Sequence, residues 1–177
     1  MRIYTRAGDD GTTGLLFGGR VRKDAPVPVA CGDVDEAQAA LGLARSAADR
    51  DPELDALVVG LQRQLWVLMA EVSTAADNRE KLRPGVTLVT AEMVEGLETL
   101  IDDLAARSDP PAEFVVPGET PSAAFLDLAR TVVRRAERNA LGVAVDGSQV
   151  VPYLNRLSDL LWTMARWREG QSLTARQ

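Results

Sequence analysis

The stretch RTVVRRAER, Arg130–Arg138, decides the fold because it predicts an amphipathic helix in an otherwise acidic chain. At about 100° per residue, Arg130, Arg134 and Glu137 fall within roughly 60° of one another on this helix. The opposite face carries the apolar side chains of Phe125, Leu128, Val132 and Ala136. Such a helix packs one face into a core and leaves the other for ions or solvent, which indicates a helical protein.

The charged face of this helix has two interpretations. The first is a solvated surface with an i,i+3 ion pair between Arg134 and Glu137. The second is part of a polyphosphate site. A glycine-rich basic segment at the N-terminus and a polar cluster at Asn155–Asp159 favour this second interpretation.

Helical segments with apolar residues at helical spacing follow the N-terminal region. Asp33, Asp51 and Thr120 are predicted N-caps, and the last two each precede a proline at the first helical position. The predicted segments cover roughly residues 33–48, 51–78, 90–109, 120–141 and 150–167. Mostly short connections and the lack of a clear strand run predict an all-α chain. We expect an antiparallel five-helix bundle with a glycine-rich N-terminal arm.

The length and composition are those of one domain. A chain of 177 residues is long enough to bury a core. We divide it into a nucleotide-binding arm (1–32), a helical bundle (33–168) and a tail (169–177) that we expect to be frayed. The formal net charge of −6 argues against nucleic acid and anionic membranes as partners. An anionic ligand therefore requires a local basic patch.

Two residue types are scarce, and this excludes several chemistries. The chain has no histidine, which removes His-dependent acid–base catalysis, Ser-His-Asp triads and most zinc sites. The single cysteine, Cys31, is interpreted as a packing residue, and cysteine usage favours a cytoplasmic location. A bound metal would be an oxygen-ligated ion such as Mg²⁺, held largely by a substrate phosphate. Without a signal peptide or a long apolar run, we expect a soluble protein.

The N-terminal arm contains TRAGDDGTTGLLFGG, Thr5–Gly19, which combines glycines with hydroxyl and basic side chains. Glycines let backbone N–H groups approach a phosphate closely. Hydroxyl donors and neutralising charge come from Thr5, Thr12, Thr13, Arg6 and Lys23. The segment is not a Walker A loop, because no G-K-[ST] follows it. It is therefore either a flexible tail or a nucleotide clamp.

Two features of the middle of the chain are ambiguous on their own. Asp33, Asp35 and Glu36 suit the N-terminal dipole of a helix, and Asp35 has the further option of pairing with an arginine elsewhere. Phe114 stands close to a Pro–Gly turn, and its residue type favours packing in the core over contact with a ligand.

The stretch YLNRLSDLLW near the C-terminus places Asn155, Asp159 and Trp162 on one helical face. One interpretation is a surface ion pair between Arg156 and Asp159. The other is that the amide of Asn155 hydrogen-bonds a nucleotide.

Together these motifs resemble the PduO-type ATP:cob(I)alamin (corrinoid) adenosyltransferases over nearly the whole chain. The resemblance is carried most specifically by three stretches, in this order along the chain. They are YTRAGDDGTT at Tyr4–Thr13, RRAER at Arg134–Arg138 and YLNRLSD at Tyr153–Asp159. Shorter matches are FGG at Phe17–Gly19, Lys23–Asp24 and Val34–Glu36.

The resemblance implies a homotrimer with active sites at the subunit interfaces. It implies transfer of the 5′-deoxyadenosyl group of ATP to the cobalt of cob(I)alamin, with triphosphate released. ATP and cob(I)alamin would be the substrates and Mg²⁺ the accompanying ion. A cob(II)alamin reductase and an adenosylcobalamin-dependent mutase would be the protein partners. No nucleic acid or membrane is implied.

The resemblance also assigns roles to individual residues. The triphosphate would be wrapped by Thr5, Arg6, Gly8, Asp9, Gly11, Thr12, Thr13 and Lys23. Arg134 would bind phosphate, while Glu137 and Asn155 would contact the nucleoside, phosphate or Mg²⁺. Asp35 and Arg130 would form a salt bridge between neighbouring subunits. Phe114 would press on the lower face of the corrin and displace its axial ligand.

Two positions depart from the family pattern: Glu119 follows Pro117–Gly118 where a second glycine is usual, and Gln38 stands where Asn or Ser is frequent. Glu119 adds a carboxylate near the expected corrin pocket. Two other functions stay open: a carrier that delivers adenosylcobalamin to a client mutase, and a regulatory helical trimer that binds ATP.

Overall fold

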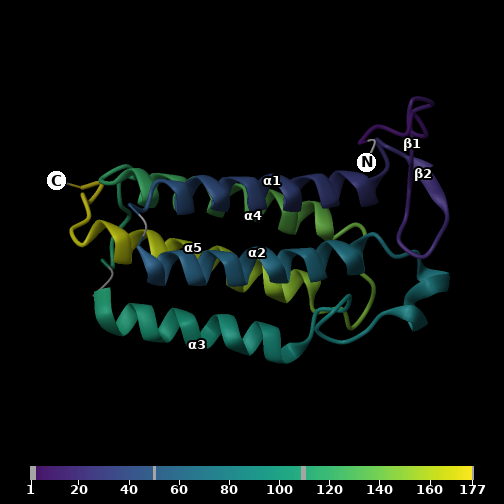
Figure 1. Cartoon of the computed structure of the whole chain (residues 1–177). Helices are drawn as coiled ribbons and strands as arrows, with labels where there is room; N and C mark the ends of the chain where they lie inside the picture. Colours follow the sequence, from purple (N-terminus) through teal and green to yellow (C-terminus); the bar gives the residue numbers. More distant parts are fainter. Residues whose placement is uncertain (1–2, 50, 109–110, 177) are drawn as a thin grey trace.

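The computed structural model describes residues 3–49, 51–108 and 111–176. Within these residues the chain forms five α-helices, one 3-10 helix and a two-stranded antiparallel sheet (Figure 1). In chain order the elements are β1 (Thr12–Gly14), β2 (Arg20–Arg22), α1 (Pro26–Ser46), α2 (Pro52–Val72), η1 (Ala76–Lys81), α3 (Ala91–Ser108), α4 (Pro121–Ala140) and α5 (Val150–Glu169). The chain is therefore mostly helical, and the small sheet corrects the expectation of an all-α chain.

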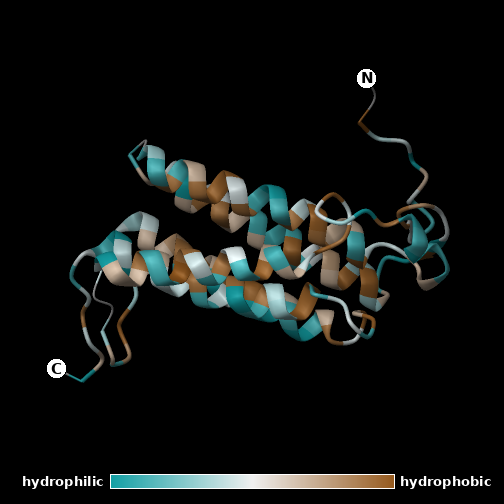
Figure 2. Cartoon of the chain, turned by 90° about the horizontal axis from the view of Figure 1, so that it is seen from below, coloured by the Kyte–Doolittle hydropathy of each residue, from teal (hydrophilic) through white to brown (hydrophobic). Residues whose placement is uncertain are grey.

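The long helices lie along a common direction (Figure 1). Helix α1 packs on α2 and α4, α4 packs on α5, and α5 packs on α3. The hairpin of β1 and β2 stands at the end where α1 begins, and the C-terminus lies at the opposite end. Hydrophilic and hydrophobic residues alternate along the helices (Figure 2), as amphipathic helices require.

The core is built from aliphatic side chains at helical spacing. Fully buried leucines from the helices include Leu41, Leu54, Leu65, Leu68, Leu97, Leu104, Leu126, Leu154, Leu157 and Leu160. Burial of one such side chain stabilises the fold by about 1.5–3 kcal/mol. Leu128, expected on the apolar face of α4, is instead 46% exposed. No helix in the described ranges is long and apolar enough to cross a membrane.

The predicted caps of α2 and α4 are confirmed. The carboxylate of Asp51 accepts hydrogen bonds from the backbone N–H groups of Glu53 and Leu54, both at 2.9 Å. The hydroxyl of Thr120 accepts one from Ala123 at 3.3 Å. Each cap satisfies donors that have no partner inside the helix. Prolines occupy the first positions of both helices, where a missing N–H costs nothing.

Helix α1 begins at Pro26, so the predicted start at Asp33 is wrong. Pro26 and Pro28 are tolerated because N–H groups in a first turn lack helical partners. Asp33 thus lies inside the helix, where its carboxylate accepts hydrogen bonds from Arg135 and Asn139 of α4. The carboxylate joins two helices instead of capping one.

The end of α2 and the C-terminal segment also differ from the sequence expectation. Helix α2 ends at Val72, before the expected end near residue 78, and η1 follows it. The C-terminal segment was expected to be frayed, yet it pairs with the segment around Phe114. The N–H of Val116 donates to Leu173 and the N–H of Ala175 donates to Phe114, both at 2.8 Å.

Candidate functional site

The hairpin of the arm is held by a short network around Thr12. The Oδ1 atom of Asp10 accepts hydrogen bonds from the N–H of Thr12 at 2.9 Å and from its hydroxyl at 2.7 Å. These bonds, the hydroxyl bond foremost, lower the pKa of Asp10. Arg20 donates to the Thr12 hydroxyl and to the carbonyl of Ala7, each at 2.6 Å. Arg20 is a structural residue of the arm that the sequence motifs did not single out.

Lys23 passes directly over Gly8. A Cβ atom at Gly8 would lie 3.1 Å from the Nζ atom of Lys23, so any larger residue would push the amine away. The backbone N–H of Lys23 donates to the carbonyl of Gly11 at 2.9 Å. Gly11 has a φ of +81°, a conformation that favours glycine. The structure therefore brings Gly8, Gly11, Thr12 and Lys23 together, and their contact with a triphosphate stays a prediction.

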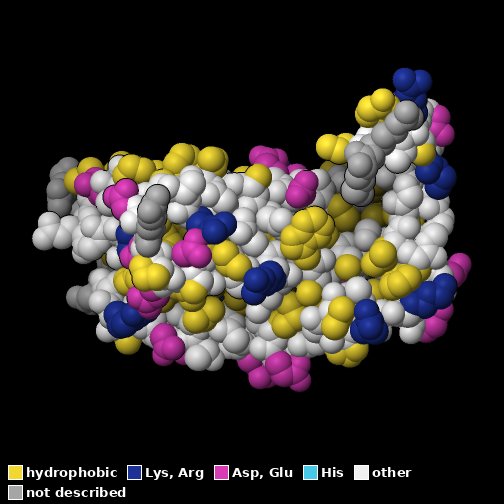
Figure 3. Space-filling view, viewed as in Figure 1, with side chains coloured by type: hydrophobic (Ala, Val, Ile, Leu, Met, Phe, Trp, Pro, Cys, Tyr) yellow, Lys and Arg dark blue, Asp and Glu magenta, His cyan; other side chains and the backbone are white. Residues whose placement is uncertain are grey.

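The rest of the arm is open to solvent. Thr5, Arg6 and Asp9 are exposed, and Thr13 lies half-buried in β1 opposite Val21. The arm is anchored to the end of α2, where the N–H of Leu16 donates to the carbonyl of Ser73 at 2.9 Å. Figure 3 shows the arm standing away from the helices, with basic side chains on it. The exposed residues of the arm are thus accessible to a ligand from solvent.

A second group of polar residues lies on the adjacent helices α4 and α5. The Nδ2 atom of Asn155 donates to Glu137 at 3.0 Å, and Arg156 donates to the Oδ1 atom of Asn155 at 2.6 Å. Arg156 also pairs with Asp159 at 2.7 Å, which confirms the predicted surface pair. Arg134 is exposed on α4, and the i,i+3 pair with Glu137 is absent from the ion pairs of the described residues.

Arg130 and Asp35 are not brought together within one chain. Arg130 donates to Asp127 of its own helix at 3.1 Å. Asp35 is exposed on α1, where it lines a shallow polar hollow together with Gln38 and Gln62. The backbone carbonyl of Gln38 accepts a hydrogen bond from Gln62 at 3.0 Å. A pair between Asp35 and Arg130 of neighbouring subunits stays a prediction.

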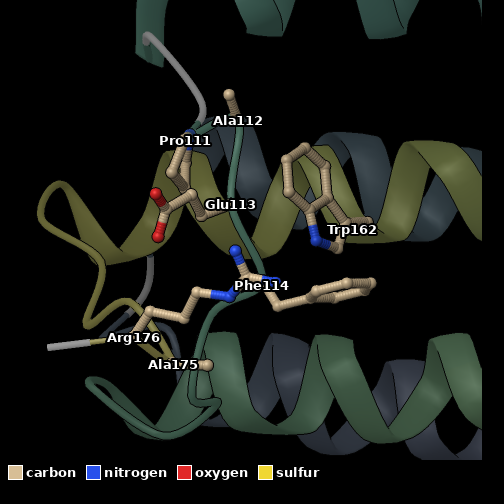
Figure 4. A pocket seen from close by; sticks show the side chains of 7 residues that line it. All are labelled: Pro111, Ala112, Glu113, Phe114, Trp162, Ala175 and Arg176. Atoms are coloured by element: carbon tan, nitrogen blue, oxygen red, sulfur yellow. The ribbon is translucent and has the colours of Figure 1, made fainter.

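Phe114 is 87% exposed, so its interpretation as a core residue is wrong. It lines a hollow of about 470 Å³ together with Trp162 of α5 and Arg176 of the C-terminal segment. In Figure 4 the rings of Phe114 and Trp162 extend to the same side of the hollow. Glu119 is exposed and is not among the residues that line it. The apolar rings suit a large flat ligand.

The described residues contain no group of three or more Asp, Glu or Cys side chains that could hold a metal. The half-buried carboxylate of Glu137 offers one oxygen ligand beside Asn155. One carboxylate suits Mg²⁺ that is bound mainly through phosphates and water. Cys31 is partly buried and packs against the core, and burial raises its pKa to about 11. This fits the packing role expected for it.

The site residues thus form two groups on one chain. The arm group contains Gly8, Gly11, Thr12 and Lys23. The second group, called here the α4–α5 face, contains Arg130, Arg134, Glu137, Asn155 and Trp162. Within the described ranges, no hydrogen bond or ion pair joins the arm to α4 or α5. A ligand that needs both groups needs either a movement of the arm or a second chain.

Comparison with known proteins gives a consistent match. A family model described as cobalamin adenosyltransferase matches residues 3–168. The corrinoid adenosyltransferase PduO of Salmonella typhimurium is 41% identical over 97% of this chain, which spans 51% of that protein. The corrinoid adenosyltransferase of Mycobacterium bovis is also 41% identical, with 98% of this chain and 96% of that protein covered.

Solved structures agree with these relatives. A variant PduO-type ATP:corrinoid adenosyltransferase from Lactobacillus reuteri, complexed with cobalamin and ATP, superposes with a TM-score of 0.88. The alignment covers 99% of this chain and 97% of that chain at 26% identity. An arginine-to-lysine variant of the enzyme from the same organism, complexed with ATP, has a TM-score of 0.85 and 27% identity, with 98% and 100% covered.

Proposed function

The chain belongs to the cobalamin adenosyltransferase family, and we propose that it transfers the 5′-deoxyadenosyl group of ATP to the cobalt of cob(I)alamin. The cobalt–carbon bond forms as the bond between C5′ and the triphosphate oxygen breaks, and triphosphate leaves. The observation that carries the proposal is the exposure of Phe114 beside Trp162. Folding alone gives no reason to hold an aromatic ring in water, whereas a corrin ligand does.

The arm supplies the triphosphate half of the site. Lys23, held over Gly8, places its ammonium group beside the glycine-rich loop. Thr5, Arg6, Asp9, Gly11, Thr12 and Thr13 complete the set that wraps the phosphates. These charges and dipoles stabilise the negative charge that develops on triphosphate as it leaves. Hydroxyl, amide and ammonium donors need no proton transfer, so the absence of histidine is no obstacle.

The α4–α5 face supplies further contacts to the nucleotide. The exposed guanidinium of Arg134 binds a phosphate, because it has no carboxylate partner within the described part of its own chain. Glu137 and Asn155, already hydrogen-bonded to each other, contact the nucleoside or phosphates. Glu137 would also hold Mg²⁺, which neutralises phosphate charge when bound.

The hollow at Phe114 supplies the corrinoid half of the site. Phe114 and Trp162 present apolar surface to the lower face of the corrin and exclude the axial ligand. Cob(I)alamin is itself the nucleophile, so the protein's task is to hold C5′ in line with cobalt. A cob(II)alamin reductase supplies this substrate, and an adenosylcobalamin-dependent mutase receives the product.

A homotrimer explains why the two groups of site residues are separate on one chain. We infer an antiparallel five-helix bundle that assembles so that the arm of one protomer meets the α4–α5 face of the next. Asp35 of one subunit then pairs with Arg130 of its neighbour. Closed cyclic assembly of this kind gives one site at each interface.

The proposed activity is tested anaerobically with MgATP and chemically reduced cob(I)alamin. The visible spectrum should change to that of adenosylcobalamin, and anion-exchange chromatography should find one triphosphate for each cobalt–carbon bond formed. Binding of cobalamin without any product, with fully reduced cobalt, would contradict the proposed function and favour a carrier.

A further inference from the structure

A network of four charged side chains, three of them buried and Arg130 partly exposed, lies between the C-terminal half of α5 and the middle of α4. The carboxylate of Asp127 accepts from Arg130 through Oδ1 at 3.1 Å and from Arg166 through Oδ2 at 2.6 Å. Arg166 also bonds Glu169 at 2.9 Å. The side chains of Arg166, Asp127 and Glu169 are 1%, 6% and 0% exposed. Two positive and two negative charges balance, which is the condition for burying them.

The network extends to the hollow through an aromatic ring. The guanidinium carbon of Arg166 lies 5.8 Å from the centre of the Trp162 ring. The Nη1 atom of Arg166 is buried and has no hydrogen-bond partner in the described part of the chain. The carboxylates of Asp127 and Glu169 balance the charge of Arg166, and the π face of Trp162 gives its guanidinium a further favourable contact. This couples the orientation of the indole to the position of Arg166.

Asp127 therefore positions two arginines, one through each of its carboxylate oxygens. On one side it fixes Arg130, the residue proposed to pair with Asp35 of a neighbouring subunit. On the other it fixes Arg166, and through it Trp162, which lines the hollow with Phe114. Neither Asp127 nor Arg166 is itself among the residues that line the hollow. Their action on a ligand there is indirect.

We propose that Asp127 and Arg166 form a buried positioning pair that sets the affinity for the corrinoid substrate and leaves that for ATP unchanged. This inference rests on the proposed function, because it takes the hollow at Phe114 as the corrinoid site. The selectivity follows from where the pair acts: Arg166 contacts the ring of Trp162, which lines the hollow with Phe114. Within the described residues, neither Asp127 nor Arg166 makes a hydrogen bond or ion pair with a residue assigned to ATP.

The test is the variant Asp127→Asn, which keeps the side-chain shape and removes the charge. We expect the KM for cob(I)alamin to rise about tenfold while the KM for ATP stays within twofold, because a charged hydrogen bond to each arginine is weakened. Asp127→Glu, which keeps the charge, should recover part of the loss. The control Asp55→Asn breaks the exposed pair with Arg45 and should change neither KM.

A spectroscopic measurement separates positioning from stability. In a variant with Trp66 and Trp167 replaced by phenylalanine, Trp162 is the sole tryptophan. Asp127→Asn and Arg166→Lys should each shift its fluorescence emission and raise its quenching by acrylamide. An unchanged Trp162 signal in both variants would overturn the proposal. So would a lowered melting temperature with both KM values at the wild-type level.

Phe114→Ala, measured alongside, distinguishes the two layers of inference. If it raises the KM for cob(I)alamin and Asp127→Asn does not, the positioning pair is wrong and the corrinoid site stands. If Phe114→Ala changes neither KM, the hollow at Phe114 is not the corrinoid site. The proposal that Asp127 acts on the corrinoid through this hollow then fails with it, even if Asp127→Asn raises the KM for cob(I)alamin.

Discussion

The position of the Lys23 side chain depends on the absence of a side chain at Gly8. The Nζ atom of Lys23 lies beside the Cα atom of Gly8, where a Cβ atom would be only 3.1 Å from it. The composition of the arm is compatible with a flexible tail or a nucleotide clamp, and the resemblance assigns both residues to the triphosphate, which stays a prediction. The support by Arg20 and Asp10 was not predicted, because hydrogen bonds across a hairpin depend on its register.

Arg134→Ala should abolish most of the activity without loosening the fold. The side chain is exposed, so the melting temperature should stay unchanged. Loss of a guanidinium at the leaving phosphates should reduce kcat/KM by about 10²–10³-fold. The control is Arg138→Ala, which removes an exposed arginine one turn further along α4. Wild-type turnover by Arg134→Ala would refute its assigned role.

Phe114→Ala should separate nucleotide binding from transfer. Calorimetry should find ATP affinity unchanged, because none of the residues assigned to ATP lines the hollow. The rate of adenosylation should fall at least about tenfold if displacement of the axial ligand depends on this ring. A parallel loss of ATP affinity would show that the ring is needed for the arm and not for the corrin.

At the level of elements, the caps at Asp51 and Thr120 were predicted correctly, whereas the cap at Asp33 was not. The caps at Asp51 and Thr120 were predictable because a cap, its proline and the following N–H groups are neighbours in sequence. The start of α1 was misplaced because Pro26 and Pro28 look like loop residues until a first turn is built around them. Strands of three residues are too short to show an alternating pattern, so the hairpin was missed.

The cap of α2 makes a prediction about pH. Asp51→Ala should lower the free energy of unfolding by about 1 kcal/mol near neutral pH, as measured by urea denaturation. The backbone N–H of Leu54 is the main cause that holds the pKa of Asp51 below its ordinary value of 3.8, and Arg168 adds to it. A lowered folded pKa stabilises above pH 3.8, and this contribution is lost as the pH falls through the folded pKa. The two proteins should therefore converge in stability in acid, whereas a constant difference would argue against the cap.

At the level of the whole molecule, the sequence and its resemblance named the candidate site residues, and the structure adds how they are divided between the arm and the α4–α5 face. The pairing of Val115 with Thr174 and the exposure of Phe114 depend on contacts between distant segments. One aromatic residue next to a turn in the sequence does not indicate which distant segment it will pair with or whether its ring will be exposed. The resemblance placed Phe114 at the corrin, while the residue type alone placed it in the core.

The separation of the arm from the α4–α5 face leads to the most direct test. Lys23→Ala removes a charge from the arm, and Arg134→Ala removes one from the α4–α5 face. Each variant alone should be inactive. In a mixed assembly of the proposed homotrimer, one interface joins a wild-type arm to a wild-type α4–α5 face. Random co-assembly should therefore restore about a quarter of the sites.

The measurement is the rate of adenosylcobalamin formation by co-expressed Lys23→Ala and Arg134→Ala chains, with the mixed composition verified by native mass spectrometry. Activity near a quarter of the wild-type rate is the expected result. Verified mixed assemblies with no more activity than the separate variants would contradict a site shared between protomers.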